Sequence, residues 1–270
     1  MPAPTAETLA ETLRPLTDMP REAAVLCDID GTLAPIVQRA DDAKVSDTTA
    51  RLLAAIARRY GCVACISGRR AAEARRLVGV GGITYAGSHG VEILWPGASH
   101  PEFSADLAEW TDRVRAFLRE NDTRELRIRR VRIEDKGPIG AFHWRGAPDE
   151  EAARERLDSI AEEAQEAGFH VHWGRKVLEV RPPVAIDKGQ AVYALMDRCP
   201  VSAALFGGDD VTDLDGFSAL DALVEDGRLR CAVRVGLRSD EGPPEIVERA
   251  DLVVDGVAGF RAVLQALSEA

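Results

Sequence analysis

The sequence predicts an α/β protein: a doubly wound (Rossmann-like) parallel-sheet core with an inserted α+β domain of two helices on a four-stranded antiparallel sheet. Both ends of the chain alternate short apolar runs with amphipathic stretches, the pattern of a parallel sheet covered by helices. The middle reads helix, two strands, helix, two strands, which favours an antiparallel sheet with helices on one face. We therefore expect residues 1–100 and 182–270 to form the core and residues 101–181 to form the insert.

The first core segment contains three short apolar runs with the length and boundaries of buried strands. They are AAVLC (23–27), CVACI (62–66) and ITYAG (83–87). Between the first two, Ser46 is a helix-capping candidate, apolar residues follow at helical spacing, and Gly61 ends the helix. The second core segment repeats this alternation. We expect its helices at 187–199, 211–226 and 256–270 and its strands at 202–208, 231–235 and 251–255.

The middle segment contains two amphipathic helices and four alternating strands. We expect helices at 105–120 and 149–167 and strands at 125–134, 138–145, 169–173 and 176–182. In the second helix an apolar stripe recurs at helical spacing, and Gly168 stands where the helix should stop. On the last strand, Lys176 and Glu179 are three residues apart, so they cannot share a face unless a bend intervenes.

The composition excludes several classes of protein. A formal net charge of -11 argues against a nucleic acid or an anionic membrane as partner. No apolar run approaches the roughly 18 residues that span a bilayer, and the N-terminus lacks the basic and apolar segments of a signal peptide. We therefore expect a cytoplasmic, monomeric, globular protein in which any anionic substrate is held by local basic groups or a cation.

Five cysteines are spread along the chain, mostly inside apolar runs, which favours buried reduced thiols over a disulfide framework. Cys62 and Cys65 form a C-x-x-C pattern within a predicted strand. Because residues three apart on a strand point to opposite faces, these two thiols cannot chelate one metal ion.

The stretch LCDIDGTLAP (26–35) places two carboxylates directly after a predicted strand. Asp28 and Asp30 are two residues apart, so on an extended chain they face one pocket, and Gly31 and Thr32 offer a turn and backbone N–H groups to an anion. Repulsion between two carboxylates in one pocket disfavours the ionisation of both, unless a cation lies between them. Otherwise one of them keeps its proton. One can then attack phosphorus while the other supplies a proton. An Asx-type turn explains the stretch equally well on its own.

Two further stretches offer groups for an anion. Ser67 follows the second strand in ISGR (66–69), where its hydroxyl can bond a phosphoryl oxygen or simply cap a helix. Lys188 stands in the first turn of a predicted helix, where a positive charge opposes the helix dipole. It can neutralise a phosphoryl group there, or it can simply be exposed to solvent.

The fourth stretch, LFGGDDVTDLDGF (205–217), carries four aspartates behind two glycines. Asp209 ends the strand, and we expect Asp210 and Asp213 one helical turn apart on the same side. Acidic residues suit a helix start, but four within seven residues are better explained as oxygen ligands for Mg²⁺. In a doubly wound sheet all four stretches would lie at the carboxyl ends of strands, where such folds bind ligands.

In identity and order, the four stretches resemble the motifs of the haloacid dehalogenase superfamily of phosphotransferases: D-x-D-G-T, a serine, a lysine and G-D-D-x-x-D. Within that superfamily, the sequence is most similar to the trehalose-6-phosphate phosphatase family. The blocks that carry this similarity are DIDGTLAPI (28–36), YAGSHGVEI (85–93), EDKG (134–137), FHWR (142–145), GRKVLEVRPP (174–183) and GGDDVTDLDGF (207–217). The resemblance covers residues 26–217, and the insert corresponds to the superfamily's cap between the second and third motifs.

The resemblance implies a Mg²⁺-dependent phosphatase that hydrolyses trehalose 6-phosphate, a phosphorylated disaccharide, through an aspartyl-phosphate. Asp28 would attack the phosphate, and Asp30 would protonate the departing sugar oxygen and then activate water. Ser67 and Lys188 would hold the phosphoryl oxygens. The implied ligands of Mg²⁺ are Asp28, Asp30 through its backbone carbonyl, and Asp209, with Asp210 or Asp213 helping through water.

Nine further residues are expected to bind the substrate, five of them on the cap, whose closure would exclude competing water. They are Thr32, Gly68, Arg69, His89, Glu134, Lys136, Arg145, Lys176 and Glu179. Among these, His89 lies within GSHG, where it is expected to shape a loop at the domain boundary rather than to act as an acid or base.

The sequence departs from the family pattern at three places without losing a catalytic group. Ile29 stands where an aromatic residue is frequent, Val211 where arginine is frequent, and residues 214–216 read Leu-Asp-Gly where Glu-Asp-Ala is usual. A phosphatase for a related disaccharide phosphate or a pseudo-disaccharide phosphate is therefore an alternative. A non-catalytic regulator that binds a sugar phosphate is a second alternative, disfavoured because the aspartates and the lysine of the motifs are present.

Overall fold

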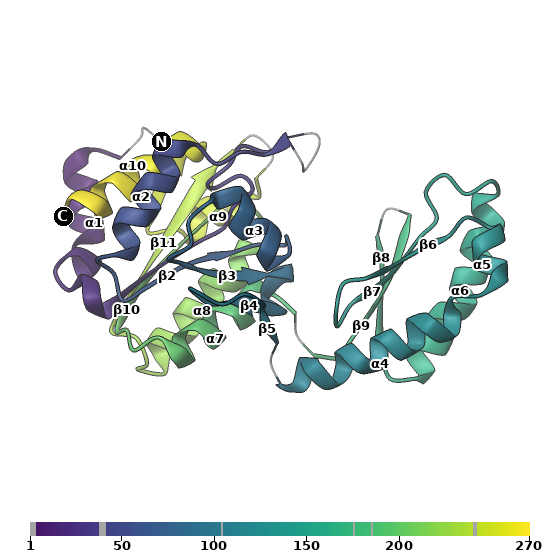
Figure 1. The fold of residues 1–270 in the computed structure, drawn as a ribbon. Coiled ribbons are helices and arrows are strands. Elements are labelled where there is room, and N and C mark those ends of the chain that lie inside the picture. Colours follow the sequence, from purple (N-terminus) through teal and green to yellow (C-terminus); the bar gives the residue numbers. More distant parts are fainter. Residues whose placement is uncertain (1–3, 38–41, 104, 175, 185, 240–241) are drawn as a thin grey trace. The chain divides into compact units, whose positions relative to one another are not determined.

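The computed structural model describes residues 4–37, 42–103, 105–174, 176–184, 186–239 and 242–270. The chain divides into two compact units, Met1–Glu102 with Ile186–Ala270 (unit 1) and Phe103–Ala185 (unit 2). Figure 1 shows that the beginning and the end of the chain are interleaved within unit 1, whereas unit 2 is built from the middle of the sequence. Unit 2 is therefore an insertion into the chain of unit 1.

Within the described residues, unit 1 is built around an eight-stranded sheet in the order β12-β11-β10-β1-β2-β3-β4-β5. The strands are β1 (Ala23–Cys27), β2 (Cys62–Ile66), β3 (Thr84–Gly87), β4 (Glu92–Leu94), β5 (Glu102–Phe103), β10 (Ala203–Gly208), β11 (Cys231–Arg238) and β12 (Leu252–Asp255). The pairs from β12 to β3 are parallel, and β4 runs antiparallel to β3. Every residue of β1, β2 and β10 is buried, which explains why these strands read as continuous apolar runs.

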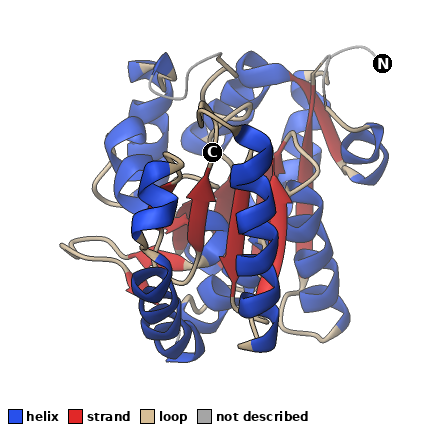
Figure 2. Cartoon of the chain, turned by 90° about the vertical axis from the view of Figure 1, so that its right-hand side faces the viewer, coloured by secondary structure: helices blue, strands red, loops and turns tan. Residues whose placement is uncertain are grey.

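Helices cover both faces of this sheet, as Figures 1 and 2 show. They are α1 (Ala6–Thr17), α2 (Asp47–Ala57), α3 (Ala71–Val78), α7 (Lys188–Arg198), α8 (Asp213–Glu225), α9 (Pro244–Arg249) and α10 (Gly256–Glu269), with 3-10 turns η1 (Pro20–Glu22) and η3 (Ser88–Gly90). One core layer contains side chains of α1, α2, α3 and α10, and the other contains side chains of α7, α8 and α9. The predicted doubly wound core is thus confirmed.

Unit 2 contains, in its described residues, an antiparallel sheet in the order β6-β7-β9-β8. Its elements are α4 (Ala105–Asn121), α5 (Arg124–Ile128), β6 (Arg132–Asp135), β7 (Gly140–His143), α6 (Glu150–Glu166), β8 (His170–Gly174) and β9 (Val177–Arg181). Side chains of α4 and α6 form one hydrophobic core with Phe142, Leu178 and Val180 of the sheet. The predicted antiparallel sheet with two long helices on one face is confirmed. None of the described helices of either unit combines the length and the apolarity needed to cross a membrane.

One predicted strand of unit 2 is wrong in its first half. We expected a strand over 125–134, but residues 124–128 form α5, and β6 begins only at Arg132. Thr123 caps the short helix by accepting the backbone N–H of Leu126 (3.4 Å), and Arg130, with a φ of 56°, redirects the chain before β6. Alternating apolar and charged residues over so short a stretch fit one helical turn as well as a strand.

Candidate active site

Strand β1 ends at a buried carboxylate. Asp28 follows the strand directly, is only 4% exposed, and donates its backbone N–H to the carbonyl oxygen of Gly207 on β10 (2.9 Å). Gly31 then turns the chain with a φ of 96°, and its N–H donates to the carbonyl of Ala34 (2.7 Å). A Cβ atom on Gly31 would stand 2.0 Å from Asp209 Oδ2, so this close approach of the loop to the end of β10 requires glycine.

The first residue of α7 places a buried ammonium group beside Asp28. Lys188 is 3% exposed, and its Nζ donates to Asp28 Oδ1 (2.7 Å) and to Asp213 Oδ1 (2.6 Å). Asp187 caps the helix by accepting the backbone N–H of Gln190 (2.9 Å), which fixes where α7 begins. The alternative that Lys188 is simply exposed to solvent is therefore wrong. Its two carboxylate partners explain a positive charge in the first turn of a helix.

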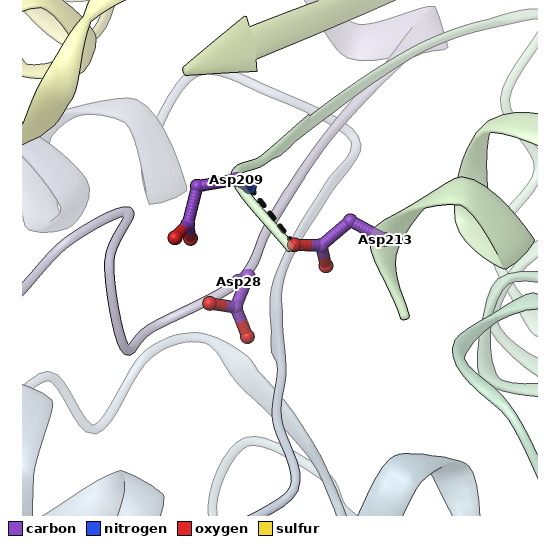
Figure 3. Close-up of side chains that lie close together, drawn as sticks. All are labelled: Asp28, Asp209 and Asp213. Carbon is purple, nitrogen blue, oxygen red and sulfur yellow. Dashed lines mark hydrogen bonds between the residues drawn. The ribbon is translucent and has the colours of Figure 1, made fainter. Parts of the chain in front are cut away.

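Three buried carboxylates converge where β1, β10 and α8 meet, as Figure 3 shows. One oxygen each of Asp28, Asp209 and Asp213 lies within 4.8 Å of the other two. Asp209 accepts the hydroxyl of Thr32 at Oδ1 (3.0 Å), which ties the loop after β1 to the end of β10. Asp213 is engaged at both oxygens, because Oδ1 accepts the ammonium of Lys188 and Oδ2 accepts the backbone N–H of Asp209 (2.9 Å).

The neighbouring aspartates of this stretch lie differently from what we expected. We predicted Asp210 and Asp213 on one side of a helix, but α8 begins only at Asp213, and Asp210 lies in the turn before it. Asp210 is exposed, donates its backbone N–H to Asp213 Oδ2 (3.0 Å) and accepts the N–H of Val211 (2.7 Å). Asp215 is also exposed. Of the four aspartates in this stretch, Asp209 and Asp213 are therefore buried, whereas Asp210 and Asp215 face solvent.

The charge balance of the buried cluster favours a bound divalent cation. Within the described residues, the three carboxylates share one contacting ammonium group, that of Lys188. Burial raises the pKa of Asp28 to about 8, an effect that Lys188 opposes and the charge of Asp213 reinforces. Burial likewise raises the pKa of Asp209 to about 6, and Asp213 adds to the rise. Closely spaced carboxylate oxygens with excess negative charge are the ligands that hard divalent cations prefer.

The loop after β2 brings a second set of predicted residues together. Ser67 is 1% exposed, and its Oγ accepts the backbone N–H of Arg69 (3.1 Å). It is not the cap of α3, because Arg70 occupies that position. The backbone N–H of His89 donates to the carbonyl of Ser67 (2.9 Å), and a Cβ atom on Gly68 would stand 2.8 Å from His89 Nε2. The missing side chain at Gly68 therefore leaves room for the imidazole of His89.

The second carboxylate of the D-x-D stretch is held by a forked ion pair. Arg69 Nε donates to Asp30 Oδ2 and Arg69 Nη2 donates to Asp30 Oδ1, both at 2.7 Å. The side chain of Arg69 is 17% exposed and that of Asp30 is 38% exposed. Two parallel charge-assisted bonds fix the orientation of a carboxylate far better than one. The structure thus places Arg69, which we expected to bind substrate, directly on Asp30.

These side chains surround a cavity of about 490 Å³ in unit 1. Its lining residues are Asp28, Asp30, Ile36, Val37, Ser67, Gly68, Arg69, His89, Lys188, Asp210 and Thr212. Sequence reasoning brought most of them together but missed Ile36, Val37 and Thr212. All three lie in or next to the motif stretches, so their position beside predicted residues was the available signal.

In unit 2, three of the predicted cap residues lie together. Glu134 on β6 and Glu179 on β9 are in register with Ala141 of the intervening strand β7. They alternate with residues that pack against α4 and α6, so they belong to the other face of the sheet. Lys136 Nζ donates to Glu179 Oε1 (3.2 Å), and the side chain of Glu179 is partly buried. The three residues therefore form one polar cluster on the helix-free face.

Two members of this polar cluster were not predicted as site residues. Arg181 Nη2 donates to Glu179 Oε2 (2.5 Å), and His143 Nε2 lies 2.8 Å from Glu134 Oε2. Burial alone would raise the pKa of Glu179, but the ion pair with Arg181 lowers it below its usual range. The signal in the sequence was strand alternation, since Arg181 is two residues after Glu179 on β9.

The remaining two predicted cap residues lie elsewhere in unit 2. Lys176 precedes β9 with a φ of 64°, and its Nζ donates to Glu150 Oε2 (2.6 Å) at the start of α6. The hydrogen bond from Lys176 lowers the pKa of Glu150, and the charge of Arg145 acts in the same direction. The positive φ of Lys176 is a bend just before β9, the condition under which these two residues could share a face. The side chain of Lys176 nevertheless pairs with Glu150 rather than with Glu179.

Comparison with known proteins shows which family this chain resembles. The model of the trehalose-phosphatase family matches residues 26–241. A trehalose-phosphate phosphatase of Mycobacterium avium is 38% identical over 212 residues, which make up 74% of this chain and 52% of that protein. An uncharacterized glycosyl hydrolase of Mycobacterium tuberculosis is 35% identical over 213 residues, which make up 74% of this chain and 15% of that protein. The chain thus spans about half the length, or less, of these relatives.

Solved structures show the same fold. The trehalose-6-phosphate phosphatase of Aspergillus fumigatus in crystal form 3 superposes with a TM-score of 0.65 at 24% identity, covering 100% of this chain and 99% of that one. The C-terminal domain of the Candida albicans trehalose-6-phosphate phosphatase gives a TM-score of 0.63 at 21% identity, covering 99% and 98%. The parallel-sheet core with an inserted α+β domain is therefore the fold of these solved structures. Since the family model covers well over half of the sequence and all four motif stretches, this chain belongs to the trehalose-phosphatase family.

Proposed function

We propose that this chain is a Mg²⁺-dependent phosphatase that hydrolyses trehalose 6-phosphate to trehalose and phosphate through an aspartyl-phosphate on Asp28. The observation that carries the proposal is the position of Asp28: buried at a strand end, bonded to Lys188, within one carboxylate cluster with Asp209, and lining a cavity of about 490 Å³. The names of the relatives and of the family supply the substrate. We further propose that it is a cytoplasmic monomer that binds no nucleic acid.

The donor set fits a magnesium ion. Asp28, Asp209 and the backbone carbonyl of Asp30 would hold it, with the exposed Asp210 acting through a bound water. Bound Mg²⁺ would offset the repulsion between these carboxylates and an incoming phosphate dianion. Asp213 belongs to the same cluster, but its bonds to Lys188 and to backbone N–H groups favour a positioning role over a ligand role.

The nucleophile and the phosphate-binding groups act from three strand ends. A carboxylate oxygen of Asp28 attacks phosphorus, and the bond from phosphorus to the sugar oxygen breaks as the new bond forms. The ammonium of Lys188 stabilises charge on the phosphoryl oxygens while it keeps its bond to Asp213. The hydroxyl of Ser67, at the end of β2, lines the same cavity and donates to a phosphoryl oxygen.

Asp30 serves as the general acid and then as the general base. Its carboxyl group gives a proton to the departing sugar oxygen and later takes one from the water that hydrolyses the aspartyl-phosphate. Both oxygens of Asp30 accept one bond each from Arg69, which leaves a second lone pair on each oxygen for that proton. Arg69 would thus orient Asp30, and Thr32 would orient Asp209 through its hydroxyl. Gly68 leaves space beside His89, which also lines the cavity.

The insert, residues 101–181, would select the sugar, and the two flanking segments would form the catalytic core. Glu134, Lys136 and Glu179 present carboxylate and ammonium groups on one sheet face, where they can bond several hydroxyls at once. Arg145 and Lys176 would extend this set from the turn regions near α6. Such dense polar contacts suit a disaccharide better than an apolar ligand.

Measurement of phosphate release from several sugar phosphates, with and without a chelator, tests this function. We expect trehalose 6-phosphate to be hydrolysed far faster than glucose 6-phosphate or sucrose 6-phosphate, and the chelator to abolish the reaction. Asp28→Asn should lower the rate by at least about 1,000-fold, whereas Asp226→Asn, at an exposed site beyond α8, should leave it unchanged. Unchanged release by Asp28→Asn would refute the mechanism. Equal rates on the three sugars would leave the phosphatase chemistry but refute the substrate, in favour of a related or pseudo-disaccharide phosphate.

A further inference from the structure

The two thiols of the C-x-x-C pattern face different layers of the core. Cys65 belongs to the layer of α1, α2, α3 and α10, and Cys62 belongs to the layer of α7, α8 and α9. This confirms that they lie on opposite faces of the strand, so they cannot chelate one metal ion. Each instead lies near a cysteine from another part of the chain, because Cys65 Sγ is 4.0 Å from Cys27 Sγ and Cys62 Sγ is 2.8 Å from Cys199 Sγ.

The closer of these pairs joins two distant elements. Cys62 is the first residue of β2, and Cys199 is the residue that ends α7. A separation of 2.8 Å is shorter than an ordinary contact between two sulfur atoms, so only a small movement is needed to reach bonding distance. Cys27 and Cys65 face each other on neighbouring parallel strands, are fully buried, and lie farther apart.

The pair is chemically asymmetric. Cys62 is 5% exposed, whereas Cys199 is partly exposed, and the two sulfur atoms share a hydrogen bond. The hydrogen bond with Cys62 lowers the pKa of Cys199, and the neighbouring Arg198 adds to this effect. The same bond and burial raise the pKa of Cys62. Cys199 is therefore the more accessible and the more readily ionised of the two thiols, with Cys62 in place to resolve the product.

We propose that Cys62 and Cys199 are an oxidation site that forms a reversible disulfide bond when the protein meets a peroxide. The Cys199 thiolate attacks one peroxide oxygen, the O–O bond breaks, and a sulfenic acid and one water form. The first water takes up the proton of the Cys199 thiol. The Cys62 sulfur then attacks Cys199 Sγ, the S–O bond breaks, and the hydroxyl group leaves as a second water with the proton of the Cys62 thiol. The two sulfur atoms together lose two electrons, and the peroxide gains them.

The bond would tie the two chain segments of unit 1 together. Cys62 lies before the insertion of unit 2 and Cys199 lies after it, at a sequence separation of 137, so the closed loop contains all of unit 2. Cross-linking so long a loop removes much of the conformational entropy of the unfolded chain. We expect the oxidised protein to melt on the order of 10 °C higher than the reduced protein.

Peptide mapping of the full-length protein tests the proposal. The reduced protein is treated with hydrogen peroxide, its remaining thiols are alkylated under denaturing conditions, and the digest is analysed by mass spectrometry without reductant. We expect a peptide pair linked through Cys62 and Cys199, loss of two of the five thiols, and complete reversal by dithiothreitol. Thermal melting before and after oxidation of the unmodified sequence measures the stabilisation without any variant.

Matched variants separate this bond from general oxidation. Cys199→Ser and Cys62→Ser should each abolish the linked peptide and the rise in melting temperature, whereas Cys231→Ser, at a partly exposed cysteine of β11, should retain both. A bond between Cys27 and Cys65, a bond between two molecules, or sulfenic acid that persists on Cys199 without a bond would each overturn the proposal. So would an unchanged count of five free thiols.

Discussion

Asp213→Asn separates the two roles that a buried carboxylate of this cluster can have. Asp213 is completely buried and accepts three bonds, from the ammonium of Lys188 and from the backbone N–H groups of Asp209 and Asp210. If it positions Lys188 and the loop after β10, the variant should lose stability and turnover but keep its affinity for Mg²⁺. If it is a metal ligand, the affinity for Mg²⁺ should fall instead.

The expected magnitudes follow from the contacts of Asp213. Removal of one partner from a buried ion pair costs about 3–5 kcal/mol. Lys188 keeps its bond to Asp28, so we expect the lower value, about 3 kcal/mol, and a melting temperature lower by about 6–12 °C. Without Asp213, the ammonium group of Lys188 would also lose its alignment with the phosphoryl oxygens of the substrate. Loss of that stabilisation of the transition state should lower kcat by about 100-fold.

The assay is phosphate release as a function of Mg²⁺ concentration, together with thermal unfolding. For Asp213→Asn we expect a low kcat and a concentration for half-maximal activation within about twofold of the parent value. Asp209→Asn serves as the ligand control and should need at least about tenfold more Mg²⁺. Asp215→Asn, an exposed change in the same helical turn, should alter neither quantity. A variant Asp213→Asn whose kcat is restored by excess Mg²⁺ would refute the positioning role.

Three further predictions concern the loop, the insert and the pH dependence. Gly31→Ala should lower activity by about 100-fold and raise the Mg²⁺ requirement, because the new Cβ would collide with Asp209 and a φ of 96° disfavours alanine; normal activity in steady-state assays would contradict this. Glu179→Gln should raise KM about tenfold with little change in kcat, whereas Glu166→Gln, at an exposed position at the end of α6, should change neither; a loss confined to kcat would count against sugar binding. Without a divalent cation, burial raises the pKa of Asp28 from 3.8 to about 8, so the folded state binds a proton more tightly than the unfolded state. The melting temperature should then fall as pH rises through this interval and recover with Mg²⁺, and a melting temperature indifferent to Mg²⁺ at pH 8 would refute the argument.

The cysteines and the cap show where sequence reasoning reached its limit. Strand alternation correctly placed Cys62 and Cys65 on opposite faces, but nothing local revealed that Cys199, at the end of a helix after the insert, lies against Cys62. In the same way, strand spacing showed that Lys176 and Glu179 could share a face only across a bend, but only the fold showed that Lys176 pairs with Glu150 instead. Both outcomes depend on contacts between residues far apart in the sequence.

The sequence by itself determined the fold class and which candidate residues stand at the ends of strands. Local propensity and apolar pattern are properties of a few neighbouring residues, so they predicted β1, β2 and β10 and placed Asp28, Ser67 and Asp209 at strand ends. Only the tertiary structure decided which of these groups are buried and which partners they contact. It buried Asp213 against Lys188 and left Asp210 in solvent, although both stand in one short stretch. Burial and the choice of partner depend on which strand ends the sheet order brings together, and that order is a property of the whole chain.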